Sequence, residues 1–270
     1  MENTERLENL QLATINLLED IEKQKSQLKD KTEKLTQLNE QLESFAYVAS
    51  HDLQEPLRKI LAFGDRLKDK AKEKLNEEEL DYLQRITNAS GRMKKLIEDL
   101  LKYSRISTQQ QKFTNTDLNQ LLHEVLDDLE TRIEQSGGKI ESDKLPVIEA
   151  DPLQMRQLFQ NLLSNALKFH KTGQGTQISI KSDIRNNMLV LSFEDNGIGF
   201  DEKFKDRIFQ PFQRLHGRQE YEGTGIGLAI CKKIVEHHHG NIEVQSEEKK
   251  GSKFIITLPL QQTQEGSVSV

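Results

Sequence analysis

A long stripe of apolar residues occupies the N-terminal part of the chain and restricts its fold more than any other feature. From Leu7 to Ala49 the stripe positions follow alternating steps of three and four, without a Gly or Pro between them. This spacing predicts a long helix that pairs with a second copy in a parallel coiled coil, so we expect a homodimer. Gln24 and Lys31 weaken the middle of the stripe, which either sets the register and permits helix rotation or is a simple imperfection. Ten of the thirteen stripe positions are apolar: Leu7, Leu10, Thr14, Leu17, Ile21, Gln24, Leu28, Lys31, Leu35, Leu38, Leu42, Phe45 and Ala49.

Composition limits the function classes. Charged residues make up 30% of the chain and the mean hydropathy is -0.70, which is too polar for one compact globule. A net charge of -6 gives no reason to expect nucleic-acid binding. The single cysteine, Cys231, excludes an internal disulfide and favours a reducing compartment. No apolar run approaches the roughly 20 residues that cross a bilayer, and the N-terminus lacks the layout of a signal peptide. We therefore expect a cytoplasmic chain without direct membrane insertion.

The apolar pattern shifts beyond Ala49, because its unbroken continuation would bury Asp52. The core then passes to four leucines, Leu53, Leu57, Leu61 and Leu67. A polar stretch around Lys68 to Leu75 ends this helix, and Asn76 with Glu79 has the spacing of a helix N-cap and its reciprocal acid. Apolar residues continue at helical spacing from Leu80 to Leu101, which predicts a helical hairpin. Two hairpins, one from each subunit, would close a four-helix bundle.

The periodicity changes after a Ser/Thr/Gln-rich linker at Ser104 to Lys112. Helices are predicted at Asp117–Gln135 and Pro152–His170, and alternating apolar residues predict strands before, between and after them. Strands are expected near Phe113 and at 139–142, 146–150, 177–183, 188–194, 241–245 and 253–258. The fold class is therefore multidomain, α and α/β: a coiled coil (1–44), a hairpin forming a dimeric four-helix bundle (45–107), an α/β sandwich with a mixed sheet (113–260) and a disordered tail (261–270).

His51 lies on the first helix, with Asp52 directly after it and Pro56 five residues on. Pro56 has no N–H for the Asp52 carbonyl and crowds it, so we expect a bend just below the histidine. A neutral imidazole is a competent nucleophile near pH 7, and Asp52 can accept the other ring proton. A His-Asp pair on a helix is most often solvated surface, so its interpretation depends on the rest of the chain.

Three further segments have residue types that suit a polar ligand. Asn161, Asn165 and Lys168 lie on one helix face, where an amide oxygen suits Mg²⁺ and an ammonium suits a phosphate. Asp195 opens the sequence DNGIGF after a strand and can accept from an exocyclic amine. The sequence GTGIGLAI from Gly223 is a glycine-rich loop before a helix, whose N–H groups can hold phosphates. Each segment alone is weak, because such loops are often mere turns.

Together and in this order, these segments resemble the histidine protein kinases of two-component signalling. The matching motifs are the H box (His51 to Pro56), the N box (Asn161 to Phe169), the first glycine box (Asp195 to Gly199), the F box (Phe209 to Phe212) and the second glycine box (Gly223 to Leu228). The H box is most similar to that of phytochrome-type kinases. The resemblance covers about residues 40 to 260 and implies a dimerisation and phosphotransfer bundle followed by an ATP-binding domain of the gyrase type.

The resemblance also implies roles for single residues. Asp195 would read the adenine amino group, Asn165 would hold Mg²⁺, and Asn161 and Lys168 would meet the phosphates. Phe169 would pack near the nucleoside, and Arg214 would approach the γ-phosphate. The other residues expected at the ATP site are Gly197, Gly199, Phe209, Phe212, Gly223, Gly225, Gly227 and Leu228.

Two positions refine this expectation. Hydrolytic relatives carry a Glu that activates water four residues before the Mg²⁺-binding Asn, whereas this chain has Asn161. Water attack should therefore be slow, which leaves His51 as the acceptor. Many members carry Thr or Asn four residues after the histidine, where this chain has Glu55, so a phosphatase activity toward the partner is in doubt.

Other histidines are weaker candidates. His237, His238 and His239 are consecutive and cannot converge on one metal ion from a helix, so with Gly240 they indicate a helix C-terminus that favours positive charge. His216 is a candidate contact of the nucleotide, and Cys231 is expected in the core.

The sequence therefore predicts an ATP- and Mg²⁺-dependent kinase that phosphorylates its own His51, with Asp52 assisting, and passes the phosphoryl group to an Asp of a response-regulator receiver domain. The alternatives are a scaffold that binds nucleotide without transfer and a simple ATPase; intact His51 argues against the first and Asn161 against the second. The upstream sensor domain is expected to be absent from this chain. The stimulus, the regulator and the choice between transfer within or across the dimer are open.

Overall fold

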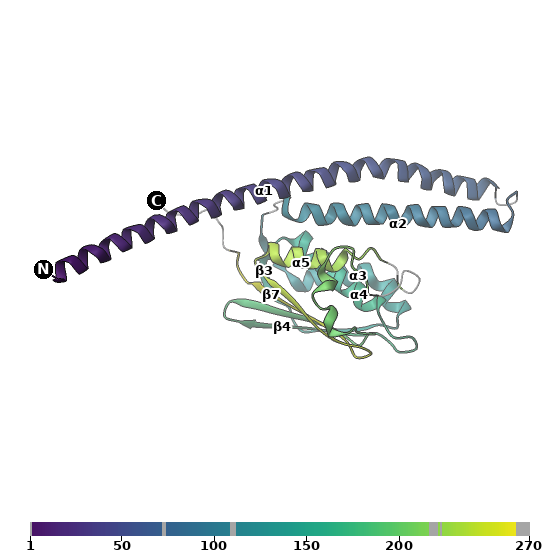
Figure 1. The fold of residues 1–270 in the computed structure, drawn as a ribbon. Coiled ribbons are helices and arrows are strands. Elements are labelled where there is room, and N and C mark those ends of the chain that lie inside the picture. Colours follow the sequence, from purple (N-terminus) through teal and green to yellow (C-terminus); the bar gives the residue numbers. More distant parts are fainter. Residues whose placement is uncertain (1, 72–73, 109–111, 216–220, 222, 263–270) are drawn as a thin grey trace. The chain divides into compact units, whose positions relative to one another are not determined.

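The computed structural model describes residues 2–71, 74–108, 112–215, 221 and 223–262, with only the backbone at 2–13, 39–40, 42–46, 49 and 107–108. The chain divides into two compact units, 1–49 and 50–270. Helix α1 (Glu2–Ala71) runs through both (Figure 1). Among the described residues, none of the helices combines the length and apolar character that spanning a lipid bilayer requires.

The first unit is helical throughout its described length, as the heptad spacing predicts. Where its side chains are described, the apolar stripe remains uncovered within one chain, since Leu17, Leu28 and Leu35 are each more than 60% exposed. A stripe of this kind requires a partner to leave water.

The second unit begins with a helical hairpin, made of the end of α1 and helix α2 (Glu77–Thr108). Asn76 and Glu79 form the predicted reciprocal cap, since Glu79 N donates to Asn76 Oδ1 at 2.9 Å and Asn76 N donates to Glu79 Oε2 at 2.8 Å. Pro56 lies inside α1 without ending it, so the bend beneath His51 stays a prediction.

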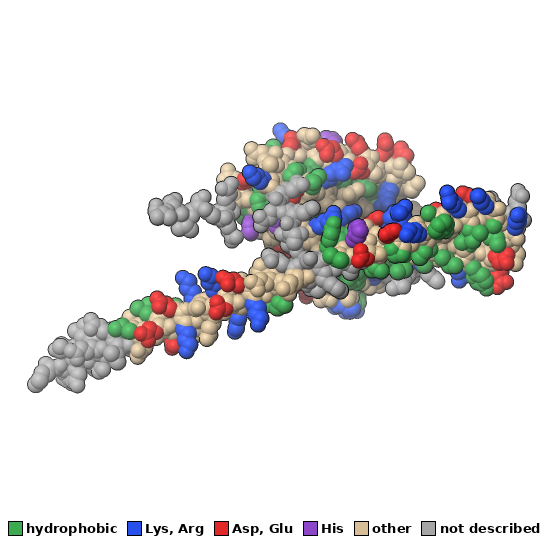
Figure 2. Space-filling view, turned by 90° about the horizontal axis from the view of Figure 1, so that it is seen from above, with side chains coloured by type: hydrophobic (Ala, Val, Ile, Leu, Met, Phe, Trp, Pro, Cys, Tyr) green, Lys and Arg blue, Asp and Glu red, His purple; other side chains and the backbone are tan. Residues whose placement is uncertain are grey.

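The hairpin buries little on its own. Leu57, Ile97 and Leu101 form its small core, and Figure 2 shows hydrophobic side chains gathered along its surface. The exposed ones in this apolar band are Leu53, Ile60, Phe63, Leu67, Ile86 and Met93.

The predicted linker starts too early, because α2 continues to Thr108. Ser104 and Ile106 are buried, and Ile106 belongs to the core of the α/β part. Tertiary packing therefore extends the helix through a stretch whose composition indicated a linker.

The α/β part pairs helices with a mixed sheet (Figure 1). The sheet order is β2-β4-β5-β7-β6, in which only β2 and β4 are parallel, and β1 pairs with β3 in a separate two-stranded sheet. Side chains of α3, α4 and α5 pack on the inward side chains of β4, β5 and β7 to form the core. The elements are β1 (Thr114–Asp117), α3 (Leu118–Gln135), β2 (Lys139–Ser142), β3 (Val147–Ala150), α4 (Pro152–Lys168), β4 (Gln177–Arg185), β5 (Met188–Asp195), α5 (Gly227–His237), β6 (Asn241–Glu247) and β7 (Gly251–Pro259), with 3-10 turns at Glu202–Phe204 and Arg207–Phe209.

Two caps fix where the site-bearing helices begin. Asp117 and Asp151 precede α3 and α4 and each accepts from backbone N–H groups of the first turn. Asp117 is the last residue of β1 and Asp151 follows the last residue of β3, so each helix starts at a fixed strand end.

The predicted tail begins too early as well. Gln262 is buried, its N–H donates to Glu149 Oε2 at 2.8 Å, and its amide donates to the His238 carbonyl at 3.3 Å. These bonds hold the chain past residue 261, while 263–270 lie outside the described residues.

Candidate functional site

One cavity of about 590 Å³ collects most of the predicted nucleotide-binding residues. They come from α4, the end of β5, the segment after the second 3-10 turn and the glycine-rich loop before α5. The predicted residues that line it are Asn161, Asn165, Lys168, Phe169, Asp195, Gly199, Arg214, Gly223, Gly225, Gly227 and Leu228.

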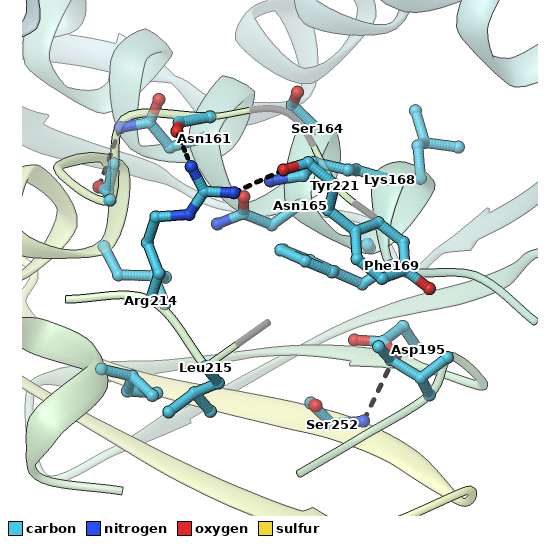
Figure 3. A pocket seen from close by; sticks show the side chains of 18 of the residues that line it. Asn161, Ser164, Asn165, Lys168, Phe169, Asp195, Arg214, Leu215, Tyr221 and Ser252 are labelled. Carbon is cyan, nitrogen blue, oxygen red and sulfur yellow. Dashed lines mark hydrogen bonds between the residues drawn. The ribbon is translucent and has the colours of Figure 1, made fainter. Parts of the chain in front are cut away.

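The polar face of α4 forms one wall of this cavity. Figure 3 shows Asn161, Ser164, Asn165 and Lys168 together on one side, with Asp195 and Ser252 on the other. Lys168 Nζ lies 4.1 Å from the centre of the Phe169 ring. The Asn165 amide makes no hydrogen bond with the described residues and is therefore available to a ligand.

Asn161 is expected to contact phosphates, but in this structure its amide bonds to other protein groups. Its Nδ2 donates to the Gly227 carbonyl at 3.1 Å, and its Oδ1 accepts from Gln157 Nε2 at 2.8 Å. Both ends of the amide are thus engaged within the protein. In this structure Asn161 ties α4 to the first residue of α5.

Asp195 lies at the end of β5, on the far side of the cavity from the asparagines. Its Oδ1 accepts from Gly197 N at 2.8 Å and from Ser252 N at 3.3 Å, while Oδ2 takes no partner among the described residues. Burial raises the pKa of this carboxyl to about 6, against the opposing effect of those two N–H groups. A half-buried carboxylate with one unused oxygen can read an amino group.

Gly197 does not line the cavity, but only glycine fits beside Asp195. A Cβ there would lie 2.4 Å from the Phe169 carbonyl oxygen and 2.7 Å from Asp195 Oδ1. Gly197 therefore acts by letting the chain approach α4 and by donating to Asp195.

Arg214 reaches into the cavity and bonds to the chain that follows it (Figure 3). Its Nη1 donates to the Gly223 carbonyl at 2.8 Å, and its Nη2 donates to the Tyr221 carbonyl. The Tyr221 ring packs on the Phe169 ring with centroids 4.9 Å apart. Sequence reasoning missed Tyr221, which lies two positions before Gly223 without a spacing that marks it.

The glycine-rich loop contacts α2 through Thr224, which sequence reasoning also missed. Its hydroxyl donates to Asp99 Oδ2 at 2.6 Å and accepts from Ile226 N at 3.4 Å. Asp99 and Lys95 accordingly line the same cavity. The residue that precedes α5, Ile226, provides no side-chain cap, so first-turn N–H groups can face an anion.

Two expected residues lie away from the cavity. Phe209 packs edge-on against Phe254 with centroids 6.5 Å apart, and Phe212 is 54% exposed with φ at 64°. The structure therefore does not bring the F-box rings to the nucleotide-binding residues, and the ring of Phe209 serves packing instead.

His51 and Asp52 form the expected pair on α1. His51 Nδ1 lies 3.3 Å from Asp52 Oδ1, and both side chains are more than 70% exposed. Glu55 bonds Lys59 at 2.8 Å, and this contact lowers the pKa of the Glu55 carboxyl. The imidazole is thus free to meet a reactant from solvent.

The expectation of positive charge at the end of α5 is wrong for His238, which is fully buried. Its Nε2 accepts from Asp151 N at 3.0 Å, so the neutral ring is required there, and burial lowers its pKa. The residue with left-handed backbone is His239 (φ 55°) rather than Gly240. Cys231 is buried as expected, which raises its thiol pKa to about 12, and His216 lies outside the described residues.

Two family models match the chain. Residues 41–109 match the His Kinase A (phospho-acceptor) domain, and residues 150–262 match the histidine kinase-, DNA gyrase B- and HSP90-like ATPase. Among curated proteins, the phytochrome-like protein Cph1 of Synechocystis is 40% identical over 93% of this chain and 33% of its own length. The sensor protein kinase WalK of Staphylococcus aureus is 29% identical over 88% of this chain and 58% of its own length. The chain spans about a third of the length of the cyanobacterial relatives.

Solved structures that resemble this one include those of ShkA and ThkA. Full-length ShkA in complex with AMPPNP has a TM-score of 0.64 over 82% of this chain and 46% of its own, at 24% identity, which shows the shared fold. The histidine kinase ThkA in complex with the response regulator TrrA has a TM-score of 0.54 over 81% of this chain and 61% of its own, at 27% identity.

Proposed function

This chain belongs to the histidine kinases, and we propose that it transfers the γ-phosphoryl group of ATP to His51 and then to an aspartate of a response regulator. In this proposal residues 1–44 transmit a signal, 45–107 carry the acceptor histidine and 113–260 bind the nucleotide. The observation that carries it is one cavity that joins a base-reading acid, Asp195, to a face of amides and cations on α4.

The chemistry at His51 follows from its tautomer. Asp52 accepts the proton on Nδ1, which leaves the lone pair on Nε2 for attack. The bond from Nε2 to the γ-phosphorus forms while the bond from that phosphorus to the bridging oxygen breaks, and ADP leaves. The proton of the resulting imidazolium passes to Asp52 or to water. Such a transfer depends on positioning and charge stabilisation more than on covalent help from the protein.

Mg²⁺ fits the residues present. Mg²⁺ prefers oxygen ligands and keeps waters and substrate phosphates around it, so one protein oxygen is sufficient. Asn165 offers an amide without another partner among the described residues, on the wall of the cavity. Bound there, the ion would neutralise charge on the phosphates, while Lys168 and Arg214 supply the protein cations.

The structure favours transfer over hydrolysis. The position that holds the water-activating Glu in hydrolytic relatives is Asn161, whose amide is tied to Gly227 and Gln157. It offers water no basic group. A nucleotide-binding scaffold without transfer is disfavoured by His51, whose imidazole is exposed and paired with Asp52.

A homodimer explains the uncovered apolar surfaces of α1 and of the hairpin. The stripe of the first unit continues the coiled coil, and the apolar band on the hairpin closes a four-helix bundle. The complex of the related ThkA with a response regulator supports the same class of partner here. Because the donor is ATP, the reaction would take place in the cytoplasm.

The test uses γ-labelled ATP with Mg²⁺. We expect label that survives base and is lost in acid, that vanishes in His51→Gln, and that moves to a receiver domain on addition. Unchanged labelling of His51→Gln would refute the acceptor, and steady phosphate release independent of His51 would favour an ATPase. Nucleotide binding without any acid-labile label would favour the scaffold.

A further inference from the structure

One guanidinium at the cavity has no role in the function proposed above. Arg132 lies in the last turn of α3 and lines the same cavity as Asn165 and Lys168. It lies outside all of the sequence motifs, more than 25 residues before the nearest one, the N box that begins at Asn161.

The guanidinium of Arg132 is held over the polar face of α4. Its Nη1 donates to Ser164 Oγ at 2.8 Å. Ser164 lies three residues after Asn161 and four before Lys168, so it belongs to the same helix face. In Figure 3 Ser164 stands beside Asn165 and Lys168, across the cavity from Asp195. The anchor of Arg132 is therefore on the side where phosphates are expected, opposite the base-reading acid.

Arg132 lacks a carboxylate partner among the residues that the structure describes, although one lies within reach along its own helix. Asp128 is four residues earlier on α3, a spacing at which an acid and an arginine commonly pair. That carboxylate is taken by Arg156 of α4, whose Nη2 lies 2.6 Å from Asp128 Oδ2. Arg156 also lies 3.8 Å from Glu124. Two arginines thus bridge α3 and α4. Arg156 is paired with carboxylates, whereas among the described side chains Arg132 bonds only a hydroxyl and keeps its positive charge uncompensated at the cavity.

We infer that Arg132 is a further positioning residue that contacts the polyphosphate chain of the nucleotide from α3. A guanidinium presents several N–H donors in a plane, so it can keep the bond to Ser164 and give others to phosphate oxygens. A ligand with several negative charges would supply the anionic partner that Arg132 lacks among the described residues. The inference rests on the proposed ATP site and adds one residue and one helix to it.

The contribution should grow with the number of phosphates. AMP carries a single phosphate, whereas ATP would extend a chain of three along α4. Loss of Arg132 should therefore weaken ATP much more than AMP, and it should raise KM for ATP with little change in kcat. A purely structural role would affect both nucleotides equally.

The test measures ATP and AMP binding to the full chain by calorimetry with Mg²⁺. For Arg132→Ala we expect ATP to bind about ten-fold more weakly and AMP to bind within about two-fold of the wild type. Arg132→Lys should recover part of the loss because it keeps the charge without the planar fork. Ser164→Ala should give a smaller loss of the same kind.

The matched control is Arg156→Ala combined with Asp128→Ala, since it removes the other arginine between the same two helices, away from the cavity lining, without freeing Asp128 to pair with Arg132. It should leave the ratio of the ATP and AMP affinities unchanged. An unchanged ratio in Arg132→Ala, or the same change in both arginine variants, overturns the inference. If the wild type binds no ATP, the proposed function itself fails, so the two failures are distinguishable.

Discussion

Asn161 Nδ2 donates to the carbonyl of Gly227 at 3.1 Å, and this bond joins the middle of α4 to the first residue of α5. The residue that differs from the hydrolytic relatives therefore has a structural partner of its own. It fixes the position of the glycine-rich loop end relative to Asn165.

Removal of this tie should cost stability. In Asn161→Ala the half-buried Gly227 carbonyl loses its side-chain donor, and we expect the free energy of unfolding to fall by about 1–2 kcal/mol. Urea denaturation without nucleotide measures it. Gln157→Ala, which removes only the partner of Asn161 Oδ1, should lose less than half as much. Equal losses in the two variants would show that the bond to Gly227 has no special weight.

Replacement of Asp195 should have opposite effects on folding stability and on ATP binding. Burial raises the pKa of its carboxyl to about 6 from 3.8, so above pH 6 the folded state carries a charge that it disfavours. That cost shrinks as pH falls through 6 and is absent below 3.8. Asp195→Asn keeps the acceptor for Gly197 N and never ionises, so it should be more stable than the wild type by about 2 kcal/mol at pH 8.

The same variant should lose ATP affinity by at least about ten-fold, because an amide that faces the adenine amino group with its own NH₂ repels it. Thermal unfolding at pH 8 and pH 4 together with calorimetric titration checks both halves. The stability gain of Asp195→Asn over the wild type should be larger at pH 8 than at pH 4. An equal gain at the two pH values would contradict the burial argument.

The buried neutral ring of His238 should make the free energy of unfolding fall at acid pH. Burial lowers its pKa in the folded state below the 6.5 of the unfolded chain, and only the neutral ring can accept from Asp151 N. Its contribution is therefore present above pH 6.5 and is lost as pH falls through the lowered folded pKa. The wild type should lose more stability between pH 7.5 and 5 than His238→Gln does.

Denaturant midpoints at the two pH values measure this difference, with exposed His123→Gln as the control that keeps the wild-type pH dependence. His237, whose pKa burial also lowers, is present in all three proteins. Parallel pH profiles for wild type and His238→Gln would show that another group causes the acid loss.

The apolar band on the hairpin should control dimer affinity. Ile60 and Phe63 are 43% and 64% exposed in one chain, and both would be buried in a four-helix bundle. Ile60→Glu with Phe63→Glu should raise the dimer dissociation constant at least about 100-fold, as expected for two lost apolar contacts and two buried charges. Sedimentation over a concentration series measures it. Ile184→Glu, at an equally exposed position on β4, should leave it unchanged.

Much of the fold follows from local patterns. The heptad stripe, the alternation of β4 and β5, and the Asn76–Glu79 cap depend on neighbours within a few residues, and the structure has them where expected. The misplaced features depend on distant contacts. Ile106 is helical because it packs on the α/β core, and Gln262 is ordered by Glu149 and His238.

The candidate site divides in the same way. Asp195, Asn165 and the glycines were predictable because their chemistry and spacing are distinctive. Tyr221, Arg132 and the contact of Thr224 with Asp99 were not, because each depends on elements far apart in the chain. The F-box motif predicts that its aromatic residues bind the nucleotide, yet Phe209 packs against Phe254.

The most direct measurement of the central claim is the site of phosphorylation. After incubation with Mg²⁺-ATP, digestion at alkaline pH and mass spectrometry should place one phosphoryl group on the peptide that contains His51, in the wild type and in Glu55→Gln. The group should be absent from His51→Gln, which lacks the acceptor, and reduced in Asp195→Asn at ATP concentrations below saturation, because that variant lacks the base-reading acid. Phosphorylation of any other residue in wild type, or an unmodified His51 peptide in protein that binds ATP, would contradict the account.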